Sequence, residues 1–142
     1  MSHATAARPE SVSMLALDLP GLTCFVLNGE VTGVDTGAGP SASRPVVDLD
    51  ALLGAGGARD GARELRLRGT TTEVRCLTAA RLYLCDVSTH DLFAVPRVLQ
   101  GGGCAPWIRG FVRLEGASET TGPALGLWLD SSALARSRHD QP

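Results

Sequence analysis

Residues 125–134 read Leu-Gly-Leu-Trp-Leu-Asp-Ser-Ser-Ala-Leu, an apolar alternation that runs into an aspartate and then into a short helix-forming segment. Alternation with a period of two is typical of a strand with one face on the core. Asp130 is a good N-cap for the turn that follows. Residues 46–53 repeat this order around Asp48 and end before Gly54, a good helix stop. The repeat fits a domain of two lobes, each closed by a strand and a helical turn.

The same period of two recurs along the chain and is interrupted by Gly, Pro and Asn turn signals. Many short strands at this spacing indicate a barrel or a sandwich, so we predict an all-β fold. Residues 35–44 are rich in Gly, Ala, Ser and Pro and predict a loop, and residues 54–61 predict a flexible junction between the lobes. The predicted strands are 15–19, 23–27, 64–68, 72–77, 81–87, 108–114 and 125–130.

Composition excludes several classes of function. The chain has 142 residues, 13 basic and 15 acidic side chains, and all of its basic residues are arginine. A formal charge of −2 argues against a protein that binds nucleic acid through phosphate contacts and against a polybasic membrane-surface protein. No apolar run approaches the ~20 residues of a spanning helix, so we expect no membrane insertion.

The cysteines and the amino terminus indicate a cytoplasmic protein. No apolar core of signal-peptide length follows a basic start. The cysteines Cys24, Cys76, Cys85 and Cys104 form no close pair, which favours buried reduced thiols over disulfides. The three histidines do not supply the paired ligands of a zinc site, so we predict no metal.

Two segments contain residue types found in catalytic or ligand-binding sites, but neither has the full pattern that such a site needs. The run Gly101–Gly103 lacks the lysine and hydroxyl of a nucleotide-binding loop. Cys85, Asp86, His90 and Asp91 are close in sequence, but Cys85 falls in a strand and His90 in a turn. We therefore predict no catalytic or cofactor-binding residue and a protein that is not an enzyme. A small enzyme or a ligand-binding barrel is a third interpretation, for which the sequence offers no site.

Several segments together resemble the CheW-like domain family of chemotaxis coupling proteins. Residues 44–54, Arg-Pro-Val-Val-Asp-Leu-Asp-Ala-Leu-Leu-Gly, resemble the "P-V-V-D-L-x-x-L-L-G" segment that closes the first lobe of that family. Residues 108–114, Ile-Arg-Gly-Phe-Val-Arg-Leu, followed by 124–134, resemble its "I-R-G-x-x-R-L … L-D-x-x-x-L" close. Further segments similar to the family are 14–34, 64–87 and 94–99.

The resemblance implies two small, SH3-like, five-stranded barrels packed against each other. Between residues 35 and 43 the chain lacks the further strand and the "I/L-x-G-x-x-N-x-R-G" motif of the family, so we expect a reduced first lobe. The predicted organisation is a disordered tail at 1–12, a CheW-like domain at 13–134 and a second tail at 135–142. Within the domain, the lobes are expected at 13–54 and 61–134.

The resemblance also implies a function without catalysis. It implies an adaptor that couples chemoreceptor-type proteins to a CheA-type histidine kinase. The alternative is a divergent structural or regulatory protein that has lost kinase coupling and acts through self-association or another partner.

Six residues are the candidates for partner contact. Arg109, Phe111 and Arg113 share one face of a predicted strand, and arginine with aromatic residues is favoured at protein interfaces. Trp107 follows a proline in a loop, where it would be a surface anchor or part of the core. The resemblance places Val31 and Val34 among residues that face a receptor or kinase, with ordinary core burial as the alternative. The full set is Val31, Val34, Trp107, Arg109, Phe111 and Arg113.

Overall fold

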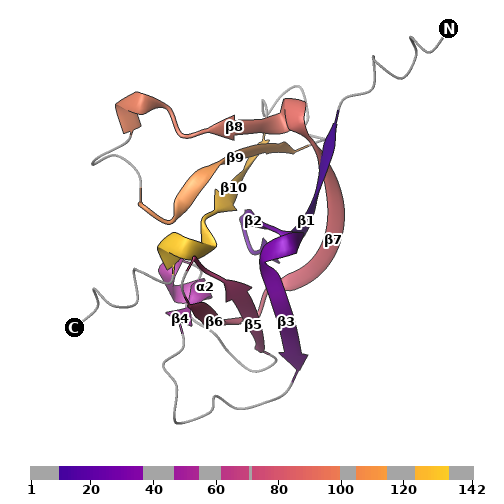
Figure 1. The fold of residues 1–142 in the computed structure, drawn as a ribbon, viewed down its shortest axis with the longest axis vertical. Helices are drawn as coiled ribbons and strands as arrows, with labels where there is room; N and C mark the ends of the chain where they lie inside the picture. The colour runs from indigo at the N-terminus through magenta and orange to yellow at the C-terminus, as the bar shows by residue number, and fades with distance from the viewer. Residues whose placement is uncertain are drawn as a thin grey trace, which may run out of the picture.

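The computed structural model describes residues 10–36, 47–54, 62–70, 72–99, 105–114 and 124–134. These residues form ten strands in two sheets, joined by short helical turns (Figure 1), so the predicted all-β fold is confirmed. The glycine run 101–103, Cys104, the junction 55–61 and the tail 135–142 lie outside the described residues.

The larger sheet has six strands in the order β7-β1-β2-β10-β9-β8. β1 and β2 form a hairpin whose turn contains Gly21 at φ +77°, a conformation that side chains other than glycine rarely adopt. β7 pairs antiparallel with β1, and β10 joins β2 in parallel. The strands are β1 (Ser11–Leu19), β2 (Leu22–Leu27), β7 (Arg81–Ser88), β8 (Leu92–Ala94), β9 (Ile108–Leu114) and β10 (Ala124–Leu129).

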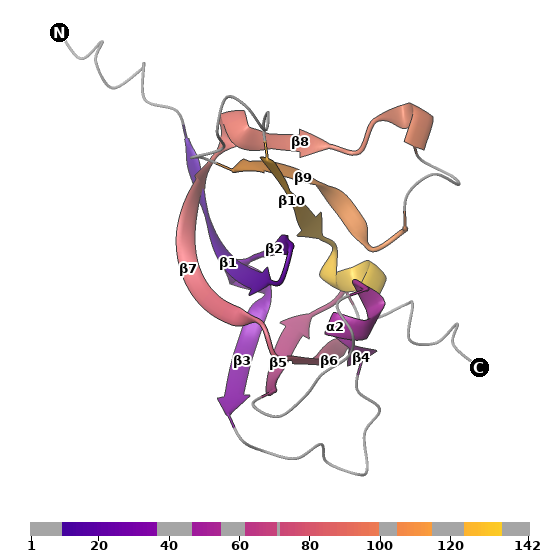
Figure 2. The same ribbon diagram turned by 180° about the vertical axis from the view of Figure 1, so that it is seen from behind.

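The smaller sheet has four strands in the order β3-β5-β6-β4, and it lies below the larger sheet in Figures 1 and 2. β4 joins β6 in parallel and leads directly into helix α2 (Leu49–Leu52). Three 3-10 turns connect other elements: η1 (Asn28–Glu30), η2 (Thr89–Asp91) and η3 (Arg97–Leu99). The strands are β3 (Val31–Thr36), β5 (Arg63–Arg68), β6 (Glu73–Thr78) and β4 (Val47–Asp48).

All seven predicted strands are present, as β1, β2, β5, β6, β7, β9 and β10. β4 corresponds to the short strand expected before Asp48, whereas β3 and β8 were not predicted; all three lie at sheet edges. β4 and β8 are two and three residues long, too short to show a period. β3 contains Gly33 and a register shift beside it, and it extends through Asp35 and Thr36, which were expected in a loop. Pairing with β5, β6 and β9 makes β3, β4 and β8 extended, and the local sequence pattern does not indicate which strand a segment will pair with.

The two sheets divide the chain differently from the expected lobes 13–54 and 61–134. β1 and β2 belong to the larger sheet because they pair with β7 and β10, whereas β5 and β6 join β3 and β4. The sheets have six and four strands, where the resemblance implied two five-stranded barrels with the first one reduced. β1 begins at Ser11, within the segment 1–12 that was expected to be a tail; residues 1–9 lie outside the described chain.

The core consists of two apolar clusters, and β1 contributes to both. Met14 to Leu17 are four buried residues in succession, which shows that both faces of β1 are covered. Met14 and Ala16 pack in the smaller cluster, formed on one face of the larger sheet with Phe25, Val87 and Val112. Leu15 and Leu17 belong to the larger cluster, which joins the two sheets through Cys24, Val26, Leu65, Leu67, Val74, Cys76 and Leu129.

The repeated strand–aspartate–turn unit is confirmed. Asp48 caps α2 by accepting a hydrogen bond from the amide of Ala51 at 3.1 Å, and Gly54 follows at φ +80°. In the second unit Asp130 accepts from the amides of Ser132 and Ala133 at 3.0 and 3.2 Å, and residues 131–134 form the turn. Each unit's strand has one parallel neighbour: β4 pairs with β6, and β10 pairs with β2 and is antiparallel to β9.

Candidate partner-binding surface

β9 alternates between the core and the outer surface of the larger sheet. Val112 is buried in the smaller core cluster, and Gly110 is buried beside it. The side chains of Phe111 and Arg113 therefore lie on the opposite face, as the period of two predicted. Arg109 lies at a register shift between β9 and β10, where this alternation is interrupted.

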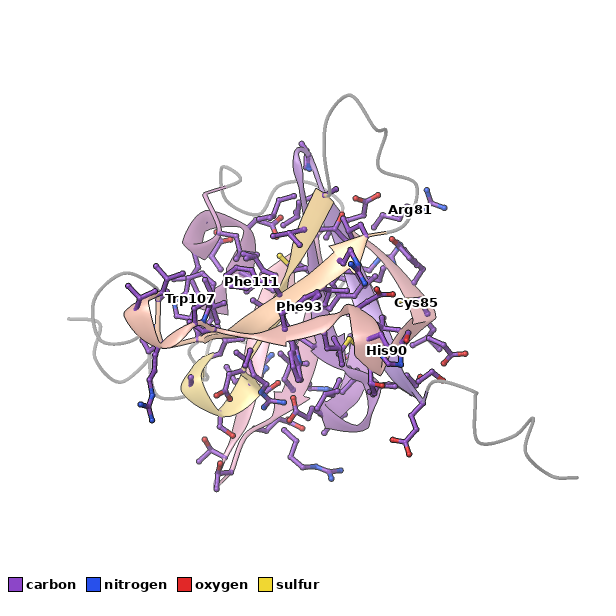
Figure 3. All side chains as sticks on the ribbon, turned by 90° about the horizontal axis from the view of Figure 1, so that it is seen from above. Arg81, Cys85, His90, Phe93, Trp107 and Phe111 are labelled. Carbon is purple, nitrogen blue, oxygen red and sulfur yellow. The ribbon has the colours of Figure 1, made fainter. Side chains whose placement is uncertain are left out.

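Two exposed apolar side chains from neighbouring strands extend this outer face. Phe93 of β8 pairs with Phe111, and Leu125 of β10 pairs with Arg113, so all four lie on one side of the sheet. Phe93 is 43% exposed and Leu125 is 53% exposed. Figure 3 shows Phe93 and Phe111 close together on β8 and β9. We call this surface the β9 face: Phe93, Phe111, Arg113 and Leu125.

Arg113 is held in place above the β9 face. Its Nε and Nη2 atoms lie 3.0 and 2.9 Å from Oδ1 of Asp91 in η2, and its guanidinium lies 5.6 Å from the ring centre of Phe93. A half-exposed ion pair of this kind contributes only about 0–1 kcal/mol to stability. Its main effect is to orient a cation beside an aromatic ring, an arrangement that favours cation–π attraction.

Gly110 allows β8 to approach β9 closely enough to place Phe93. A Cβ atom on residue 110 would collide with the carbonyl oxygen of Phe93 and crowd the ring of Trp128. The glycine of the Ile-Arg-Gly segment is therefore required by backbone contact, and the β9 face depends on it.

Arg109 points to a different place, the junction of the two sheets. Its Nη2 atom lies 3.3 Å from Oε2 of Glu30 and 3.6 Å from Oδ1 of Asp130, and its guanidinium lies 5.3 Å from the Trp128 ring centre. The hydroxyl of Ser131 donates to Glu30 at 3.0 Å. This junction cluster (Glu30, Arg109, Asp130 and Ser131) connects η1, β9 and the second helical turn.

No protein-family model matches the sequence, and no curated protein matches it. Among solved structures, the chain is similar to the crystal structure of the scaffolding protein TtCheW from Thermoanaerobacter tengcongensis. The TM-score is 0.61 at 12% sequence identity, and the match covers 87% of this chain and 90% of that chain. The fold is CheW-like. The architecture expected from the quoted motifs is therefore confirmed at the level of the fold.

The CheW-like fold does not bring all six candidate residues together. Val31 and Trp107 pack against the larger core cluster, and the carbonyl of Trp107 accepts from the amide of Asp130 at 2.8 Å. Val34 is 39% exposed on β3, in the other sheet. The sequence pattern did not indicate Phe93, Leu125 or Glu30, because their roles depend on cross-strand neighbours; only Asp130 had a local signal, as a helix cap.

The thiols are in environments that disfavour the thiolate form. Burial raises the pKa of Cys76 to about 12, and burial with the charge of Asp50 raises that of Cys24 to about 12. Burial and then Asp86 raise the pKa of Cys85. A cysteine nucleophile needs a lowered pKa, so these directions argue against the Cys85–His90 interpretation. Within the described ranges, no three His, Cys, Asp or Glu residues form a group that could hold a metal, and no helix could cross a membrane.

Proposed function

We propose that this chain is a non-catalytic adaptor that couples chemoreceptor-type proteins to a CheA-type histidine kinase. The observation that carries the proposal is the β9 face, an aromatic and aliphatic patch with an oriented arginine on a fold similar to that of a scaffolding protein. Protein interfaces favour aromatic residues and arginine at such positions.

An adaptor also needs a second, separate contact surface. Val34 supplies a candidate on β3, which belongs to the smaller sheet and lies at the opposite end of the molecule from β8 (Figure 1). The junction cluster connects the elements between these surfaces and holds β9 against η1, which leads into β3. In this proposal the β9 face binds the kinase and the β3 edge around Val34 binds the receptor-type protein.

The test measures binding of the intact chain to the CheA-type kinase of the same organism by titration calorimetry. Phe93→Ser and Arg113→Glu should each weaken kinase binding about tenfold or more, since truncation of an interface anchor costs about 1–2 kcal/mol. Leu84→Ser is the matched control, because Leu84 is 64% exposed on β7, outside the β9 face. Circular dichroism confirms that each variant is folded.

The second surface is tested with the receptor-type protein in the same format. Val34→Asp should weaken receptor binding and leave kinase binding unchanged. Failure of the wild-type chain to bind either protein contradicts the proposal, and loss of kinase binding in Leu84→Ser would contradict the assignment of the β9 face.

A further inference from the structure

β7 differs from the other three edges of the two sheets. It pairs with β1 over eight consecutive residues without a register shift. β8 has three residues and β4 has two, while the pairing of β3 is interrupted beside Gly33. Short or irregular edges resist the addition of another strand, whereas a long, regular edge accepts one. β7 is therefore the single edge of the described sheets that suits strand addition.

The direction of the backbone groups on β7 follows from one hydrogen bond at its end. The amide of Thr89 donates to the carbonyl of Glu10 at 2.9 Å, in register with the β1·β7 pairs. Bonded and non-bonded pairs alternate in an antiparallel ladder, so the odd-numbered residues of β7 bond to β1. The amides and carbonyls of Leu82, Leu84 and Asp86 therefore point away from β1, where the described chain places no strand.

A pocket of about 520 Å³ opens beside this edge. One wall is β7 from Tyr83 to Ser88, and the other is the end of β9 with Asp91, although β7 and β9 are not neighbours in the sheet order. The lining includes Phe25, Val87 and Val112 of the smaller core cluster. The sheet therefore curls until β7 and β9, which are not paired with each other, face each other across a slot with apolar side chains at its base. Figures 1 and 2 show that β7 and β8 run in different directions from the turn that connects them.

The slot is bounded on one side by β7 and on the other by β9, and this limits which kind of polypeptide can bind in it. The β7 edge of a second copy would arrive with its own β1 attached, and the wall of β9 leaves no space for a second sheet. A single extended segment needs no flanking strand and pairs with β7 alone. Its inward side chains would contact Phe25 and Val112, and its outward side chains would lie opposite Leu84 and Asp86.

The charge at the slot indicates one further property of the segment. Arg113, which lines the slot, is paired with Asp91. Asp86, exposed on β7, has no ion pair among the described residues. A basic residue on the outward side of the segment complements it across the strand pair.

We propose that the free edge of β7 binds an extended segment of another protein, which adds to the sheet as a strand. The segment alternates apolar and polar residues, inserts the apolar ones into the slot and carries a basic residue opposite Asp86. This mode of binding takes affinity from backbone hydrogen bonds and specificity from the pocket. The slot adjoins the β9 face and shares Arg113 with it, but the proposal does not depend on the binding of a kinase or receptor.

The probe is a peptide selected with the intact chain from a displayed library of random peptides about ten residues long, enough to span β7. Leu84→Pro removes an outward amide without removing a bond to β1, as edge strands tolerate. It should weaken peptide binding about tenfold, the equivalent of one backbone hydrogen bond. Leu84→Thr, which keeps the amide, should bind like the wild type.

Two further measurements keep the test independent of the folding of Leu84→Pro. A copy of the peptide methylated at alternate backbone nitrogens should lose binding to the wild-type chain. In hydrogen exchange, the amides of Leu82, Leu84 and Asp86 should exchange fast in the free chain and slowly with peptide. Those of Tyr83, Cys85 and Val87 should be slow in both.

Three outcomes overturn the proposal. The first is that no peptide is enriched, or that the enriched peptide tolerates backbone methylation. The second is that the peptide protects amides elsewhere and leaves those of β7 unchanged. The third is a dimer of the wild-type chain, detected by sedimentation and lost in Leu84→Pro, which would assign the edge to a second copy.

Discussion

The two helical turns that end β4 and β10 have the same local design and opposite surroundings. In the first, Asp50 is 2% exposed and accepts hydrogen bonds from the hydroxyl of Thr78 at 2.6 Å and the amide of Ala79 at 2.8 Å. In the second, the Asp130 side chain is 27% exposed and shares Arg109 with Glu30. One turn thus fastens α2 to β6 inside the protein, and the other supports a charged cluster at the surface.

The difference teaches that a repeated motif predicts local structure without predicting its use. Burial of a carboxylate lowers the stability of the fold unless the group is fully hydrogen-bonded. The hydrogen bonds of the first turn therefore serve the stability of the fold. Half-exposed ion pairs contribute little to stability and leave charge accessible, so the second turn is free to serve a surface role. The predictions below test this contrast, from the largest expected effect to the smallest.

The largest effect concerns the thiols buried with the first turn. Because the pKa values of Cys24 and Cys76 are about 12 against an ordinary 9.0, their thiolate fraction at pH 8 should be about a thousandfold below that of an exposed cysteine. In a Cys104→Ser background, a chromogenic disulfide reagent should label Cys85 first and the other two only on unfolding. Equal labelling rates for all three thiols would show that the first turn and its surroundings open readily.

Asp50→Ala should lower the free energy of unfolding by about 3 kcal/mol, because it leaves the partners of a buried carboxylate unsatisfied. Denaturant titration measures the loss, and the thermal midpoint should fall by about 10 °C. Asp50→Asn, which keeps one acceptor, should lose less. A loss below about 1 kcal/mol in Asp50→Ala would erase the contrast between the two turns.

The caps themselves should behave alike in both units. Asp48→Ala and Asp130→Ala should each lower the free energy of unfolding by about 1 kcal/mol, the usual contribution of an N-cap. Measurement is by the same denaturant titration. If Asp130→Ala cost as much as Asp50→Ala, the second turn would be a buried structural element and the junction cluster would need another explanation.

The smallest expected effect is a pH dependence of stability that a buried ion pair shows and an exposed ion pair does not. Hydrogen bonds from Arg75 hold the pKa of Glu64 below its ordinary 4.5, and both side chains are nearly buried. Since the folded-state pKa is the lower one, this stabilisation is present above pH 4.5 and is lost as pH falls through the folded-state value. The stability difference between wild type and Glu64→Gln should therefore shrink in acid.

Glu30→Gln is the matched control for that experiment, because Glu30 is half-exposed beside Arg109. It should change stability by less than about 1 kcal/mol at pH 7. A stability difference for Glu64→Gln that stays constant from pH 7 to about 3 would contradict the role assigned to the charge of Glu64.

Much of the fold was predictable because its signals are local. The long strands have a period of two, and the caps Asp48 and Asp130 precede their helical turns as predicted. The outer position of Phe111 and Arg113 followed from the same period, whereas Arg109 points to the junction of the two sheets. The β9 face was only half predicted, since Phe93 and Leu125 reach it through pairing with β9 from distant parts of the chain.

By itself, the sequence determined the all-β class, the repeated strand–aspartate–turn unit and the face on which Phe111, Val112 and Arg113 lie, because each depends on neighbours a few residues apart. Only the tertiary structure decided that β1 pairs with β7, that Val31 and Trp107 contact the core and that Val34 is exposed on an edge. Strand order and burial arise from contacts between residues far apart in the chain. A sequence pattern of short period does not indicate which distant strand will pack against the segment that contains it.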